Sequence, residues 1–206
     1  MPPHPTPDRP NPTPDALHAP WRMSYIDMLG VETDPQQPAT DTPDPAPGAC
    51  FLRRYWLTPD EDQANRVIVR TGTPASGRGG LIMLNAYPYA NGHLLVCLGE
   101  SRMRLHDYSE EDRRELWSLT DLAVELCERA LAPQGVNVGL NMCSAAGAGV
   151  PEHLHVHVVP RWNGDVNFIT TVGGVRVIPS AMEDMQRRYE GAWSAFREEH
   201  RLPARG

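Results

Sequence analysis

The sequence of 206 residues has no apolar run of about 18 residues, the length that a membrane-spanning helix requires. Its first residues, 1–5, also lack the apolar core of a signal peptide. Basic residues form no cluster, and 26 acidic against 19 basic side chains give a formal net charge of −7. An acidic chain of this kind is a poor general binder of nucleic acid or of anionic membranes, although a few local donors can still hold one phosphate group. We therefore expect a cytoplasmic protein with no nucleic-acid partner and no membrane partner.

Cysteine is scarce and widely spaced. The four cysteines are Cys50, Cys97, Cys127 and Cys143, and no two of them form a Cys-x-x-Cys pair. A disulfide framework would be unusual in a non-secreted chain of this length. We therefore predict free and mostly buried thiols.

Proline is abundant at one end only: 13 of the 21 prolines fall in residues 1–49. This composition predicts a mostly disordered N-terminal extension. An apolar island at 20–29 interrupts it, and we expect that island to dock on the folded body, the alternative being a sticky tail with no partner surface. The body is predicted to span residues 50–200, followed by a short tail at 201–206.

The body shows alternating strand and helix patterns. From Cys50 onward the sequence is strand-like, and Ser109 begins a long helix as its N-cap, with acidic residues in the first turn. The expected strands are 67–69, 81–84, 93–97, 136–142 and 154–159, the last ended by Pro160, and the expected helices are 109–132 and 180–200. The order β-β-β-α-β-β-α predicts an α+β fold, an antiparallel sheet with the long helix packed on it and a C-terminal helix.

Three histidines alternate with apolar residues near the end of this pattern. On a strand, His153, His155 and His157 would share one face, about 6.5–7 Å apart, while the residues between them would form the opposite, apolar face. Three interpretations remain open: a metal site, a solvent-facing row, or a catalytic face. Three imidazoles on one straight strand rarely converge on one ion. As a catalytic face, the central His155 is the best-placed nucleophile because a histidine lies on either side to orient it.

A loop with little side-chain bulk, residues 144–149, comes just before the histidines. Such a loop alone is usually a plain turn. Its backbone N–H groups can also approach an anion closely. Beside three histidines, the loop predicts a phosphate cradle next to a nucleophile.

The pattern His-φ-His-φ-His-φ-φ, with φ apolar, fills residues 153–159 and resembles the signature of the histidine-triad (HIT) superfamily at all seven positions. Upstream, Asn85 and His93 resemble the family's Asn…Gly-His strand pair, and His93 corresponds to a fourth active-site histidine. Segments 19–26, 137–141, 146–149 and 160–168 are similar to the diadenosine tetraphosphate phosphorylase-like branch. The resemblance covers about residues 50–200 and implies a HIT-like antiparallel sheet, usually in a homodimer.

The resemblance also implies a mechanism. His155 would attack the α-phosphorus of a nucleotide and form a nucleotidyl-imidazole intermediate, which a second acceptor resolves. His153 would hold the tautomer of the nucleophile, and His157 and His93 would donate to phosphate oxygens. The substrate-binding residues implied are Asn85 at the ribose; Asn141, Ser144, Gly147 and Gly149 around the phosphates; and Trp162 as a wall of the pocket. No metal is required, although Mg²⁺ can accompany the polyphosphate.

The sequence departs from its relatives in two places. Many of them carry a Cys-x-x-Cys zinc site near the start of the domain, where this chain has Cys50 and Arg53; His106 falls about where a zinc-binding histidine occurs. One cysteine and one histidine do not complete a tetrahedral site, so we expect no structural zinc. Second, Gly149 replaces the glutamine of the dinucleotide hydrolases, as in the phosphorylase-like members, while Val150 replaces the usual hydroxyl residue.

The resemblance therefore implies an enzyme that phosphorolyses diadenosine tetraphosphate to ATP and ADP, with inorganic phosphate as the acceptor. One alternative is hydrolysis, of dinucleoside polyphosphates or of nucleoside phosphoramidates. Another is a nucleotide-binding protein without catalysis. The assembly expected is a homodimer or a higher homo-oligomer.

Overall fold

The computed structural model describes residues 50–165 and 180–202. The chain divides into two units, Met1–Asp34 and Pro35–Gly206, and every described residue belongs to the second. The predicted extension at 1–49, its island at 20–29 and the end of the 201–206 tail lie outside the described residues. Within the described ranges, no helix is long and apolar enough to span a membrane.

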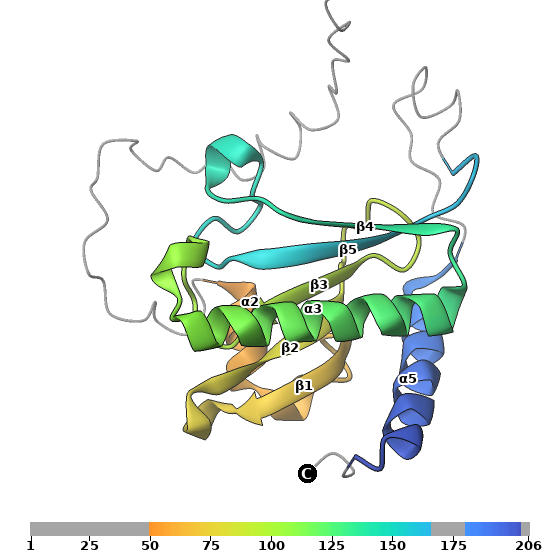
Figure 1. The fold of residues 1–206 in the computed structure, drawn as a ribbon, viewed down its shortest axis with the longest axis horizontal. Helices are drawn as coiled ribbons and strands as arrows, with labels where there is room; N and C mark the ends of the chain where they lie inside the picture. Colours follow the sequence, from red (N-terminus) through yellow and green to blue (C-terminus); the bar gives the residue numbers. More distant parts are fainter. Residues whose placement is uncertain (1–49, 166–179, 203–206) are drawn as a thin grey trace, which may run out of the picture. The chain divides into compact units, whose positions relative to one another are not determined.

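Five strands form one antiparallel sheet in the spatial order β1-β2-β3-β5-β4 (Figure 1). The strands are β1 (Val67–Thr73), β2 (Arg78–Leu84), β3 (Leu94–Leu98), β4 (Gly135–Leu140) and β5 (His155–Arg161). Each neighbouring pair is antiparallel. Within residues 50–165 and 180–202, the last strand in sequence, β5, is thus an interior strand, while β4 forms an edge.

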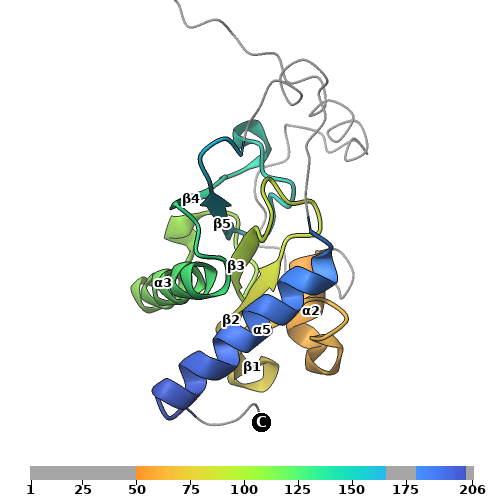
Figure 2. The ribbon, with the colours of Figure 1, turned by 90° about the vertical axis from the view of Figure 1, so that its right-hand side faces the viewer.

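Helices cover both faces of this sheet, and the predicted α+β fold is confirmed. The helices are α2 (Phe51–Leu57), α3 (Glu110–Leu131) and α5 (Met182–Glu199), with short 3-10 turns η1 (Pro59–Glu61), η2 (Pro74–Ser76), η3 (Leu105–Asp107) and η4 (Ser144–Ala146). Figure 2 shows α3 and α2 on opposite sides of the strands. The predicted cap of α3 is present: the Ser109 hydroxyl accepts from the Asp112 amide, and the Asp112 carboxylate accepts from the Ser109 amide.

The helix α2 corrects the expectation of strand-like structure from Cys50 onward. Leu52 and Trp56, four residues apart, both point into the core, which is the spacing of a helix face. The helix lies close to the sheet because of Gly99, where an added Cβ would come within 2.2 Å of the Trp56 ring. A short apolar run could not distinguish helix from strand here.

One face of the sheet is apolar from strand to strand. Val69, Ile82 and Val96 lie side by side on β1, β2 and β3, and Val156 continues the row on β5. This row packs under α3 and α5 in the main hydrophobic core. The prediction that residues 154, 156 and 158 would form the apolar face of the histidine strand is confirmed, since all three belong to that core.

The opposite face is apolar on β1, β2 and β3 and carries imidazoles on β5. Under α2, a smaller core of β-strand side chains packs around Leu52 and Trp56. In the strand register, Cys97 of that core pairs with His155, and Leu95 pairs with His157. The four cysteines are free thiols, three of them buried, as predicted.

Pro160 does not end the last strand, contrary to expectation, because β5 continues to Arg161. Pro160 pairs with Val136 of β4, and the pairing of β5 with β3 stops at Val158. The carbonyl of Arg161 accepts from Gln134 on the β4 side. Successive residues of a strand form hydrogen bonds with the neighbouring strands on alternate edges. Pro160, next to Arg161, therefore turns its nitrogen toward the β3 side, where the pairing has already ended and no N–H is needed.

Candidate active site

The three histidines of the signature come together at the start of β5. His155 and His157 lie on the strand and share the face turned toward α2, as their spacing predicts. His153 precedes the strand, in a bend, and its side chain is fully buried. His155 is only 5% exposed. The site is therefore a partly buried row of imidazoles in which the first member belongs to the core.

The hydrogen bonds of His155 fix its tautomer. Its Nδ1 lies 2.8 Å from the main-chain carbonyl oxygen of His153. A carbonyl can only accept, so Nδ1 carries the proton, and in the neutral ring Nε2 keeps its lone pair. The bond supports the nucleophile assignment, and it is the main-chain carbonyl of His153 that holds the tautomer.

His153 is held from two sides. Its Nε2–H donates to the carbonyl of Leu98, at the end of β3, over 2.8 Å. Its Nδ1 therefore carries the lone pair, and the thiol of Cys50 lies 3.4 Å from that nitrogen. The ring thus connects the end of β3 with the residue that begins α2.

His93 and His157 form a second hydrogen-bonded pair. The amide of Tyr89 donates to Nδ1 of His93 over 3.0 Å, and the side-chain amide of Asn85 lies 3.2 Å from the same nitrogen. Nε2 of His93 therefore carries the proton and donates to Nδ1 of His157 over 3.0 Å. By the same reasoning the free proton of His157 is on Nε2, where it can serve as a donor to a phosphate oxygen.

Burial keeps both strand histidines neutral. It lowers the pKa of His155, although the bond to the His153 carbonyl opposes this shift. It lowers the pKa of His157 to about 4, and the neighbouring His155 adds to the effect. At neutral pH the site therefore offers a bare nitrogen and an N–H donor beside each other, with ring centroids 5.0 Å apart.

Two residues that we expected to contact the substrate, His93 and Asn85, form hydrogen bonds with other residues of the protein. His93 is fully buried and directs its Nε2–H to His157, so we assign it to setting the tautomer of His157 rather than to direct phosphate contact. Asn85, expected at the ribose, donates to His93 and accepts from the amide of Tyr87. Both residues lie beside the histidines, and each contact described is with another residue of the protein.

The loop predicted to cradle phosphate is a tight turn around η4. The amides of Ala146, Gly147 and Ala148 bond to the carbonyls of Cys143 and Ser144, which leaves fewer amides for an anion than expected. Asn141 reaches toward the Gly147 carbonyl, 3.4 Å away, so it braces this loop. Ser144 and Gly147 are exposed and Gly149 is half-buried, which keeps them available to a ligand.

Trp162 lies just after β5 and is half-buried. Its amide donates to the carboxylate of Asp165, whose own amide bonds back to the Trp162 carbonyl. Asp165 also pairs with Arg161. Asp165 therefore closes a turn that begins at Trp162.

Two residues of the site were missed in the sequence. Tyr89 stacks on His157, with ring centroids 5.4 Å apart and an interplanar angle of 27°, and tilts against His93 at 4.7 Å. Cys50 was noted only as a leftover of a zinc motif, whereas it contacts the first histidine of the signature. The position of Tyr89, four residues before His93, was the one sequence signal that could have indicated its place in the site. Nothing in the sequence pairs residue 50 with residue 153.

The described part of the chain offers no ready metal site. Within residues 50–165 and 180–202, no group of three or more His, Cys, Asp or Glu side chains lies close enough to hold an ion. Arg53, at the position of a second zinc cysteine, donates to the Gly99 carbonyl over 2.6 Å. His106 is exposed and faces Asp107. These residues do not fit a tetrahedral zinc centre.

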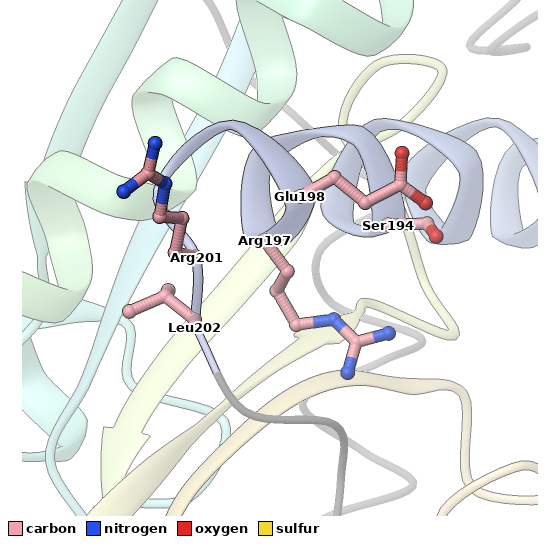
Figure 3. A pocket seen from close by; sticks show the side chains of 5 residues that line it. All are labelled: Ser194, Arg197, Glu198, Arg201 and Leu202. Atoms are coloured by element: carbon pink, nitrogen blue, oxygen red, sulfur yellow. The ribbon is translucent and has the colours of Figure 1, made fainter.

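Two shallow depressions lie on α5, away from the histidines. Figure 3 shows the one of about 290 Å³ near the C-terminal end of the helix, lined by Ser194, Arg197, Glu198, Arg201 and Leu202. The other lies near the start of α5, around Ser180 and Arg188. Neither contains a side chain of the histidine cluster.

The chain is similar in sequence to known proteins. Residues 79–164 match the HIT domain family. A Mycobacterium tuberculosis protein named AP-4-A phosphorylase is 36% identical over 178 residues, which span 86% of this chain and 84% of that protein. A bis(5'-nucleosyl)-tetraphosphatase [asymmetrical] from Schizosaccharomyces pombe is 29% identical over 82 residues, which cover 40% of this chain and 44% of that protein.

Among solved structures, a zinc-bound histidine triad family protein from Mycobacterium smegmatis superposes with a TM-score of 0.56. The match covers 74% of this chain and 99% of that one, at 24% identity. At this identity, the likeness establishes the fold alone.

Proposed function

Because the chain belongs to the HIT family, we propose that it transfers a nucleotidyl group from a dinucleoside polyphosphate through a covalent intermediate on His155. The observation that carries the proposal is the 2.8 Å bond between Nδ1 of His155 and the His153 carbonyl, which leaves Nε2 as a lone-pair nucleophile. The phosphorylase from Mycobacterium tuberculosis, similar over 84% of its length, supports diadenosine tetraphosphate as the substrate.

The first step forms a phosphorus–nitrogen bond. The Nε2 lone pair of His155 attacks the α-phosphorus, the bond to the bridging oxygen breaks, and ATP leaves with that electron pair. Nε2–H of His157 is available to hydrogen-bond a phosphate oxygen as charge develops there, and it needs no proton from solvent because the ring is already neutral.

The second step regenerates the histidine. An oxygen of inorganic phosphate attacks the adenylyl phosphorus, the phosphorus–nitrogen bond breaks, and the electron pair returns to Nε2, which releases ADP. Gly149 in place of glutamine leaves room for this second anion, and Trp162 can form a wall against water. If water attacked instead, the product would be AMP, and the protein would be a hydrolase.

Product identity tests this proposal. The protein is incubated with diadenosine tetraphosphate with and without millimolar phosphate, and products are separated by anion exchange. ADP plus ATP, at a rate that rises with phosphate, supports it; AMP plus ATP at a rate indifferent to phosphate assigns hydrolysis. His155→Ala serves as the control for contaminating enzymes, and adenosine phosphoramidate as a parallel substrate tests the other alternative.

We extend the proposal to cofactors. Neither step requires a metal, and the zinc motif is incomplete at Arg53, so the protein is expected to work without a bound ion, with Mg²⁺ at most accompanying the polyphosphate. Turnover should survive removal of zinc by a chelator when Mg²⁺ is added back. Loss of activity that only zinc restores would contradict this part of the proposal.

We also propose a homodimer in the cytoplasm. The edge strand β4 carries exposed Val138, and exposed Met142 follows it, so a second copy could pair there and extend the sheet. The four free thiols agree with a reducing compartment. Light scattering of the protein and of Val138→Lys tests the assembly: a dimer that becomes a monomer in the variant supports β4 as the interface.

A further inference from the structure

The thiol of Cys50 lies at the start of α2 and is turned toward the histidine cluster. Cys50 is the N-cap residue of α2, yet its side chain makes no capping hydrogen bond. It is instead 3% exposed and lies 3.4 Å from Nδ1 of His153, a residue 103 positions later in the chain. The only polar group of this side chain therefore faces the first histidine of the signature.

The direction of that contact follows from the other side of the ring. The Leu98 carbonyl can only accept, so the His153 proton is on Nε2 and a lone pair is on Nδ1. The Cys50 S–H must then be the donor. Burial supports this direction, because it raises the pKa of the Cys50 thiol and keeps it protonated.

The contact between Cys50 and His153 is connected to the nucleophilic Nε2 of His155 through two hydrogen bonds. The ring of His153 is fixed by Cys50 on one side and by Leu98 on the other. The carbonyl of the same residue accepts from Nδ1 of His155 and so keeps the nucleophilic Nε2 bare. A His153 ring that lost one of its two bonds could rotate or exchange tautomers, and its main chain would hold His155 less well.

We propose that Cys50 is a positioning residue of the reaction, whose thiol donates to Nδ1 of His153 and thereby orients the carbonyl that sets the tautomer of His155. This inference rests on the proposed function only in its kinetic consequence. The thiol acts through His153 on His155, and the hydrogen bond exists whichever acceptor resolves the intermediate.

The kinetic test compares three variants of the full chain. Cys50→Ala removes the donor, Cys50→Ser restores one, and Cys127→Ala removes a buried thiol from α3, in the core on the other face of the sheet. We expect Cys50→Ala to lower kcat about 10-fold with KM changed less than about twofold, the effect of one buried hydrogen bond on positioning. Cys50→Ser should recover to within about threefold of the wild-type kcat, and Cys127→Ala should stay within about twofold of it.

The structural test needs no turnover. In ¹⁵N spectra of the wild-type side chains, His153 should be a neutral ring protonated at Nε2, and its Nδ1 resonance should move in Cys50→Ala but not in Cys127→Ala. If the wild-type protein turns over no dinucleotide, the proposed function fails while these spectra still decide the thiol contact.

Three results would overturn the inference. One is a His153 ring protonated at Nδ1 in the wild-type protein. Another is equal loss of kcat in Cys50→Ala and Cys127→Ala, or no loss in either, with both folded by circular dichroism. The third is one equivalent of zinc in the purified wild-type protein that Cys50→Ala lacks, since a metal would require the thiolate.

Discussion

The strand β5 contributes apolar side chains to one face of the sheet and histidines to the other. Toward α3 and α5, β5 contributes Val156 and Val158 to a core that continues across β3 and β2. Toward α2, the same strand contributes His155 and His157, next to an apolar core that ends at Cys97 and Leu95. A strand repeats every two residues, so seven residues can serve packing and chemistry at once. Substitutions on one face should therefore change stability, and those on the other should change turnover.

The largest effect should come from the histidine face. His155→Ala removes the nucleophile, and we expect kcat to fall by more than about 10³-fold while nucleotide affinity changes only a fewfold. Rapid-quench kinetics on diadenosine tetraphosphate, with equilibrium binding in parallel, would measure both. His106→Ala, an exposed histidine away from the cluster, is the control. Near-normal turnover in His155→Ala would end the covalent mechanism.

A substitution on the apolar face should lower stability and leave turnover nearly unchanged. Leu126 of α3 is fully buried in the main core. Leu126→Ala should lower the free energy of unfolding by about 2–5 kcal/mol, since it removes buried methyl groups and leaves a cavity. Urea titration measures this, and kcat below the unfolding transition should stay within about twofold. Exposed Glu128→Ala on the same helix is the matched control; a larger loss there would contradict the assignment of faces.

The apolar face was the more predictable of the two. The alternation of residues 153–158 and the spacing of apolar residues in α3 follow from the periods of strand and helix, and both are confirmed. The helix α2 was missed, because the buried pair Leu52 and Trp56 fits a short amphipathic turn as well as a strand. Periodicity identifies long elements better than short ones.

The histidine site was only half predictable. The shared face of His155 and His157 follows from sequence spacing alone. The groups that hold the ring of His153 do not: the Leu98 carbonyl and the Cys50 thiol reach it through tertiary packing between distant segments. Sequence spacing indicates which side chains share a strand face, but it carries no information about the backbone groups that other elements bring to them.

The pH dependence of stability sharpens the comparison, because His155 and His157, whose pKa values are lowered by burial, both lie on the polar face. The folded pKa of His157 is about 4, below its ordinary value near 6.5. As pH falls from about 6.5 toward 4, His157 takes up a proton in the unfolded chain but not in the folded chain, so the free energy of unfolding declines. His157 should contribute a loss of about 2 kcal/mol between pH 7 and pH 5.

This contribution is measured as a difference. Denaturant unfolding of the wild-type protein and of His157→Gln is followed from pH 7 to pH 5, which removes the shared effect of the carboxyl groups. The variant should show the flatter profile. His106→Gln, which changes an exposed histidine, should follow the wild-type profile. Parallel profiles for the wild-type protein and His157→Gln would mean that His157 titrates normally in the folded state.

The smallest effect expected is at Tyr89, where the polar face gains an aromatic wall. Its ring stacks on His157 at 5.4 Å, while its backbone amide, which alanine and phenylalanine both keep, donates to His93. Tyr89→Ala should lower kcat/KM about 2–10-fold, because an aromatic pair contributes about 0.5–1.5 kcal/mol, whereas Tyr89→Phe should stay within about twofold. Phe196→Ala removes a comparable stacked pair with Trp193 on α5 and should leave kcat/KM unchanged. Steady-state kinetics of the three variants decide: an equal loss in Tyr89→Phe would assign the role to the hydroxyl group, and no loss in Tyr89→Ala would show that His93 alone orients His157.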